Sequence, residues 1–92
     1  MAKKILILET SVTVQKLFTM TLDSDDYSIQ FVGDGKAAVY GLFDFQPDLF
    51  LINSSIEKPK SFEVVRLVRS IACFRELTIA LYSASPSPLD ED

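Results

Sequence analysis

An apolar run in the middle of the chain, residues 49–52, constrains the fold more than any other stretch. It reads LFLI, follows the turn-forming pair Pro47-Asp48 and ends at the amide Asn53. Apolar residues without alternation are typical of a strand covered on both faces, as in a parallel sheet between helices. Ligands of such open sheets bind beyond the carboxyl ends of the strands. The run therefore predicts a central strand over 47–53 whose last residue, Asn53, lies in a site.

Elements of alternating type surround this strand. Residues 5–8 and 78–82 are apolar and rich in branched side chains, which favours two more strands, and residues 28–32 suit a strand nearer the sheet edge. Apolar residues at helical spacing predict three helices, the first capped by Thr10 or Ser11 and the third by Ser61: about 11–22, 36–45 (weakened by Gly41) and 61–71. The predicted inward faces include Leu17, Phe43, Phe62 and Leu67. The order βαβαβαβ predicts four parallel strands with helices on both faces.

Composition narrows the class of function. The 92 residues suffice for one small domain, and the net charge of -4 argues against nucleic acid or an anionic membrane as the main partner. No stretch is long enough for a membrane span or a signal-peptide core, which predicts a cytoplasmic protein. The chain has no histidine, and we expect its single cysteine, Cys73, to be a small buried apolar side chain. Prolines and acidic residues predict a flexible acidic tail or linker over 85–92, after a domain over 1–84.

Five motifs occur in one order along the chain: KILILETS at 4–11, Asp34-Gly35 followed by KAA, Pro47-Asp48-Leu49 leading to Asn53, Phe62-Glu63-Val64, and LYSA at 81–84. With these motifs, residues 3–84 resemble the receiver domain of bacterial two-component response regulators. The resemblance implies a flavodoxin-like α/β fold with strand order 2-1-3-4 and three helices. It also implies that the family's usual last strand and helices are lacking here.

The resemblance also implies roles for individual residues. In the family, an acidic pair after the first strand and an aspartate after the third hold Mg²⁺. That aspartate also accepts a phosphoryl group from a histidine kinase, and a Thr or Ser after the fourth strand responds to it. By the same positions, Glu9 and Thr10 take the place of the acidic pair, and Asn53 takes the place of the phosphoacceptor. Ser55 falls at the position of the metal-binding carbonyl, and Ser83 at that of the switch hydroxyl. The lysine that follows the family's fifth strand has no counterpart.

These replacements predict an inactive pocket. Mg²⁺ usually needs one or two carboxylates, and of the three expected only Glu9 is present. Phosphoryl transfer needs a nucleophilic carboxylate oxygen, which the amide of Asn53 does not offer. We therefore expect no phosphorylation by the ordinary route, no metal, no cofactor and no enzyme activity. Two interpretations of the pocket remain open: its polar groups hydrogen-bond one another after the site has decayed, or its geometry mimics one fixed signalling state.

The predicted fourth strand is the second notable feature. Without the family's fifth strand, it becomes an apolar edge available for pairing with another chain: Thr78, Ile79, Ala80, Leu81 and Tyr82. The leading hypothesis is a pseudo-receiver that works without phosphorylation as a protein–protein interaction module in bacterial signalling. It would form homodimers or dock a protein partner at this edge, and no small-molecule substrate is expected.

Three alternatives remain. In the first alternative, the chain is a receiver fragment of a larger signalling protein whose full-length form covers the edge. In the second alternative, a non-standard residue accepts the phosphoryl group: Ser54, Ser83 or Glu9. The fold belongs to a flavin or nucleotide enzyme with a phosphate loop at 10–13, although that segment has no glycine with which to wrap a phosphate.

Overall fold

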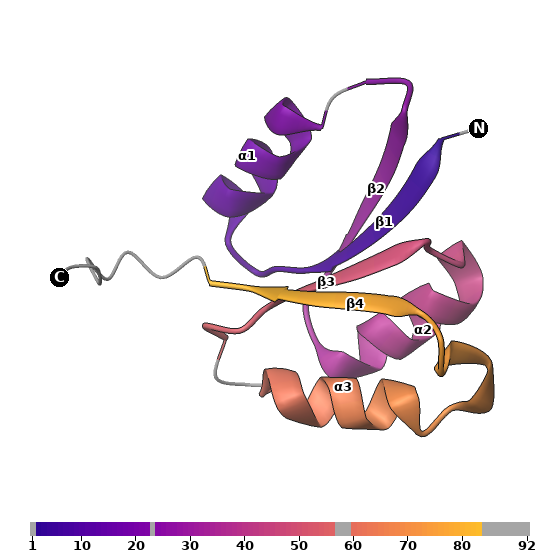
Figure 1. Ribbon diagram of the computed structural model, residues 1–92. Helices are drawn as coiled ribbons and strands as arrows, with labels where there is room; N and C mark the ends of the chain where they lie inside the picture. Colours follow the sequence, from indigo (N-terminus) through magenta and orange to yellow (C-terminus); the bar gives the residue numbers. More distant parts are fainter. Residues whose placement is uncertain (1, 23, 57–59, 84–92) are drawn as a thin grey trace, which may run out of the picture.

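Four parallel strands form a single sheet in the order β2-β1-β3-β4 (Figure 1). The computed structural model describes residues 2–22, 24–56 and 60–83. The elements along the chain are β1 Lys3–Leu8, α1 Val12–Thr21, β2 Tyr27–Val32, α2 Gly35–Phe45, β3 Leu49–Asn53, α3 Ser61–Arg69, the short 3-10 helix η1 Ala72–Phe74, and β4 Thr78–Tyr82. This confirms the predicted alternation, the strand order and the edge position of the second strand.

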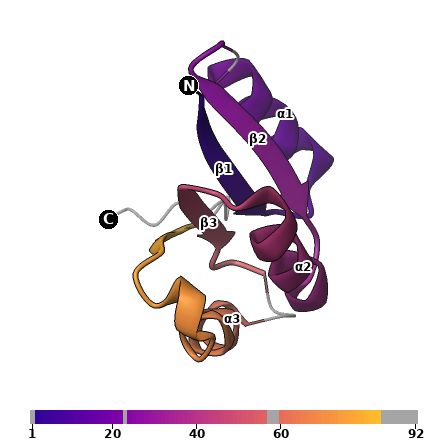
Figure 2. The same ribbon diagram turned by 90° about the vertical axis from the view of Figure 1, so that its right-hand side faces the viewer.

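The helices lie on both faces of the sheet. Figures 1 and 2 show α1 on one face and α2 with α3 on the other. The first helix is capped by Ser11, one of its two predicted caps, whose side chain accepts from the Val14 N–H. The second helix is capped by Asp34, which was not predicted as a cap and whose side chain accepts from the Ala37 N–H. The caps fix where α1 and α2 begin relative to β1 and β2.

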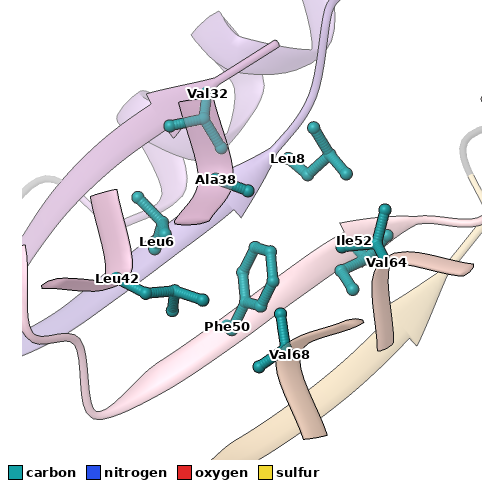
Figure 3. Packing of buried hydrophobic residues seen from close by; sticks show 9 residues of the cluster. All are labelled: Leu6, Leu8, Val32, Ala38, Leu42, Phe50, Ile52, Val64 and Val68. Atoms are coloured by element: carbon teal, nitrogen blue, oxygen red, sulfur yellow. The ribbon is translucent and has the colours of Figure 1, made fainter. Parts of the chain in front are cut away.

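The core lies between the sheet and the pair α2 and α3. Figure 3 shows the cluster, with Phe50 at its centre: Leu6, Leu8, Val32, Ala38, Leu42, Phe50, Ile52, Val64 and Val68. Gly41 of α2 is buried in this layer, and a Cβ built on it would lie 3.2 Å from Cδ1 of Leu6. The glycine weakens the helix by propensity but lets α2 pack closely on β1.

The opposite face has thinner cover. α1 buries no residue completely, and its main contact is Phe18, whose ring centroid lies 5.2 Å from that of Tyr82 and 6.5 Å from that of Phe31. Leu17, predicted to point inward, is 56% exposed. The prediction is wrong there because the sheet contacts α1 through only one narrow strip of its surface.

Other predicted details also differ. The apolar face of α3 is narrower than predicted, because Val64 and Val68 alone are buried, while Phe62 and Leu67 are exposed. The helix ends at Arg69, whose guanidinium donates to the carbonyl oxygens of Phe74 and Arg75 and so stabilises the turn of η1. Phe74 is the last residue of η1, and Arg75 is the residue after it.

Further corrections concern single residues. Phe43 is 52% exposed on α2, and Cys73 of η1 is exposed rather than buried. The third helix has Lys60 as its N-cap residue in place of Ser61, with no side-chain cap. The third strand spans Leu49–Asn53 and not 47–53. Just before it, the Asp48 N–H donates to the carbonyl oxygen of Lys4 on β1, and the Asp48 carboxylate accepts from the Lys4 N–H.

The predicted tail over 85–92 lies outside the described residues. Within the described ranges, no helix has the length and apolar character needed to cross a membrane.

Candidate functional site at the carboxyl edge of the sheet

Three strands bring polar side chains together where they end. Glu9 follows β1 directly, Asn53 is the last residue of β3, and Tyr82 is the last residue of β4. Asn53 and Tyr82 are paired residues in the register of β3 and β4. Directly paired residues on parallel strands point to the same face, which here is the face that carries α1.

The carboxylate of Glu9 is the centre of this cluster. Glu9 is 1% exposed, yet both of its carboxylate oxygens accept hydrogen bonds. Oε1 accepts from Nδ2 of Asn53 at 2.8 Å and from the hydroxyl of Tyr82 at 2.5 Å, and Oε2 accepts from the backbone N–H of Ser11 at 2.9 Å. Ser11 is the N-cap of α1, so the positive end of the helix dipole also faces this charge. The protein itself therefore compensates the buried negative charge.

The amide of Asn53 uses both of its polar atoms. While Nδ2 donates to Glu9, Oδ1 accepts from the backbone N–H of Ser55 at 2.8 Å. The side chain is 5% exposed. An aspartate here would present an oxygen to Oε1 of Glu9 where the amide now presents a donor, and two close carboxylates repel each other. Asparagine has the shape of aspartate without its charge, so it fits beside Glu9 without a cation between the two side chains.

Tyr82 is a site residue that sequence reasoning missed, because it was singled out only as part of the strand edge. Burial, its hydrogen bond to Glu9 and the negative charge of Glu9 all raise the pKa of Tyr82 well above its ordinary value. The phenol therefore stays protonated and remains a donor. Its hydroxyl reaches Glu9 because Tyr82 ends β4 opposite Asn53, a pairing that the sequence alone does not specify.

The hydroxyl groups lie at the rim of the site. The Oγ atoms of Ser55 and Ser83 are 3.0 Å apart, and both residues are exposed. Ser54 donates from its backbone N–H and from its hydroxyl to the carbonyl oxygen of Tyr82. Thr10 is exposed to solvent next to Glu9. The structure thus places Glu9, Asn53, Ser55 and Ser83 at one edge of the sheet, while their functional roles remain predictions.

The residues present do not fit a Mg²⁺ ion. The two oxygens of Glu9 are engaged, and Asn53 turns its nitrogen rather than its oxygen toward that carboxylate. Among residues 2–22, 24–56 and 60–83, no three His, Cys, Asp or Glu side chains gather as a metal site would require.

Comparisons with known proteins place this arrangement in context. No family model matches the chain. A chemotaxis response regulator of Vibrio cholerae superposes with a TM-score of 0.81 at 20% sequence identity, covering 96% of this chain and 73% of that one. The chain has the fold of a receiver domain. The N-terminal domain of a response regulator receiver protein from Methanoculleus marisnigri gives 0.79 at 21% identity, with 92% and 70% covered.

A third receiver-like structure comes from a different kind of protein. The signal receiver domain of a signal transduction histidine kinase from Syntrophus aciditrophicus gives a TM-score of 0.79 at 24% identity, and the match covers 95% of this chain and 66% of that one. At these identities the likeness concerns the receiver fold. Its functional meaning for this chain depends on the site itself.

Proposed function

We propose that this receiver-like domain is a pseudo-receiver, a protein–protein interaction module of bacterial signalling that works without phosphorylation. The observation that carries the proposal is the hydrogen bond from Asn53 Nδ2 to the buried carboxylate of Glu9. In the receiver fold, the end of the third strand is where the resemblance puts the phosphoacceptor aspartate. Here that position holds an amide that donates a hydrogen bond to the neighbouring carboxylate of Glu9.

The chemistry of the pocket supports an inactive site. A phosphoryl acceptor must offer a nucleophilic oxygen, and electrostatic stabilisation of the transferring group normally depends on a cation. Asn53 lacks that oxygen, and Glu9, which is 1% exposed, accepts hydrogen bonds at both of its carboxylate oxygens. An ion could bind here only if the three hydrogen bonds to the buried carboxylate were broken, which would be unfavourable.

The two hydroxyl alternatives are also poor acceptors. The hydroxyl of Ser54 donates to a backbone carbonyl, and that of Ser83 shares a hydrogen bond with Ser55. A serine nucleophile needs a general base within hydrogen-bond reach, and the buried carboxylate of Glu9 already accepts from other donors. These contacts favour the interpretation of a decayed pocket whose polar groups satisfy one another.

The surface available for binding is the outer edge of β4. β4 pairs with β3 on one side only, and no helix or strand of the described chain pairs with its other side. Its five residues include no charged side chain and no proline, which are the usual protections of an edge strand. We propose that the edge takes a protein strand, from a second copy or from a partner, and that nucleic acid, membranes and small molecules are not its ligands.

The proposal is tested by measuring association with and without a phosphodonor. The molar mass from light scattering after size exclusion is recorded for the 92-residue chain before and after incubation with Mg²⁺ and acetyl phosphate. A receiver domain with an aspartate acceptor, treated in parallel, shows that the donor is active. We expect the same molar mass in both conditions for this chain. A change of molar mass that appears only with the phosphodonor would contradict the proposal.

A further inference from the structure

The edge of β4 has a pattern that selects its occupant. We propose that two copies of this chain pair along β4 in antiparallel orientation, with the twofold axis at Ala80. The two four-stranded sheets then join into one continuous sheet. The inference rests on the proposed function and deepens it by naming the partner as a second copy.

The backbone of β4 fixes which residues can pair. The carbonyl oxygen of Tyr82 accepts from Ser54, on the β3 side. The N–H and C=O of one residue point to the same side of a strand, and successive residues alternate. Thr78, Ala80 and Tyr82 therefore bond toward β3, while Ile79 and Leu81 turn their backbone groups to the open side. An antiparallel copy centred at Ala80 places Ile79 opposite Leu81 of the second copy, and each such pair exchanges two hydrogen bonds.

The side chains are complementary in the same register. On the face that carries α2 and α3, partly buried Ile79 meets Leu81, whose side chain is 53% exposed in the single chain. On the face that carries α1, Thr78 lies opposite Tyr82, and the two alanines at position 80 meet at the axis. In the paired strands, apolar side chains therefore meet apolar side chains on one face, and the pairs on the other face are of mixed character. Cross-strand pairs of this kind stabilise a sheet, and the small alanine suits the close, non-hydrogen-bonded position.

The other edge of the sheet does not offer the same pattern. β2 is also an edge strand, but on the face that carries α2 it has Ser28 and Gln30 before the buried Val32, where β4 has Ile79 and Leu81. Figure 1 shows β4 in front of β3, away from β2, with α1 and α3 on opposite faces. The apolar, self-complementary edge is therefore that of β4.

Cysteine cross-linking tests the register. In a Cys73→Ser background, Ala80→Cys places two thiols opposite each other across the axis, where the Cα atoms of a non-hydrogen-bonded pair lie about 4.5 Å apart. This separation is within the range that a disulfide spans. The matched variant Thr78→Cys places its thiols four residues out of register, about 13 Å apart. After mild oxidation we expect a disulfide-linked dimer from Ala80→Cys and none from Thr78→Cys.

The molar mass of the unmodified chain completes the test. We expect twice the 10.3 kDa of one chain, reduced to one chain by Leu81→Lys and unchanged by Leu17→Lys, an equally exposed leucine on α1. A monomeric wild type would overturn the inference and assign the edge to another protein or to a further segment of the same polypeptide. Cross-linking of Thr78→Cys as readily as Ala80→Cys would overturn the antiparallel register. Neither result would bear on phosphorylation, which tests the proposed function separately.

Discussion

Replacing Tyr82 by phenylalanine isolates one of the three donors that hold the Glu9 carboxylate. The ring keeps its edge-to-face contact with Phe18, and only the hydroxyl that donates to Oε1 is lost. A hydrogen bond to a charged group stabilises a protein by about 1.5–3 kcal/mol. Glu9 is 1% exposed, so water cannot readily replace the missing donor. We therefore expect Tyr82→Phe to lower the free energy of unfolding by about 1.5–3 kcal/mol.

Urea unfolding followed by circular dichroism measures this loss. With a slope of about 1.5 kcal/mol/M for a domain of this size, the midpoint should fall by about 1–2 M. Tyr40→Phe is the matched control, because Tyr40 is 66% exposed on α2, and its midpoint should stay within experimental error. If the two variants have equal midpoints, the buried carboxylate does not depend on Tyr82, and the account of the site is wrong.

Three further predictions concern the same site and the core. Burial, the hydrogen bond to Glu9 and the charge of Glu9 raise the pKa of Tyr82, so the stability that Tyr82 contributes is complete below about pH 10 and is lost as the pH rises through the folded-state pKa. Spectrophotometric titration of the phenol should show a lower pKa in Glu9→Gln, which still exceeds the ordinary value because burial remains. Asn53→Asp should lower the free energy of unfolding by about 2–4 kcal/mol in urea, because it exchanges a donor for a second carboxylate, and added Mg²⁺ with Thr10→Asp should recover part of the loss only if the metal site is merely disarmed. Gly41→Val should destabilise by about 1–3 kcal/mol in the same assay, because atoms beyond its Cβ have no room beside Leu6, and an unchanged midpoint would show that the layer can expand.

The sequence predicts the architecture well because its strands are apolar in different degrees. The uninterrupted run at 49–52 lies at the centre of the sheet, and the less apolar sequence of residues 28–32 lies at an edge. Helix faces were less predictable. Leu17 and Leu67 have the spacing of inward residues, but how much of a helix the sheet covers is a property of packing, which periodicity does not contain.

The pocket was predictable by position and not by interaction. The sequence indicated that Glu9 and Asn53 end neighbouring strands, and it left open whether their polar groups satisfy one another. That question depends on Tyr82, whose hydroxyl reaches Glu9 from a strand 73 residues away in the chain. A contact over such a separation follows only from the register of β3 with β4, which the sequence does not specify.

We propose that this receiver-like domain does not accept a phosphoryl group, because Asn53 offers no carboxylate oxygen and both oxygens of Glu9 already accept hydrogen bonds. Intact mass spectrometry of the chain after incubation with Mg²⁺ and excess acetyl phosphate measures this directly. We expect one species at the unmodified mass throughout the incubation, while a receiver with an aspartate acceptor gains a phosphoryl group under the same conditions. A gain of one phosphoryl group by this chain would contradict the account.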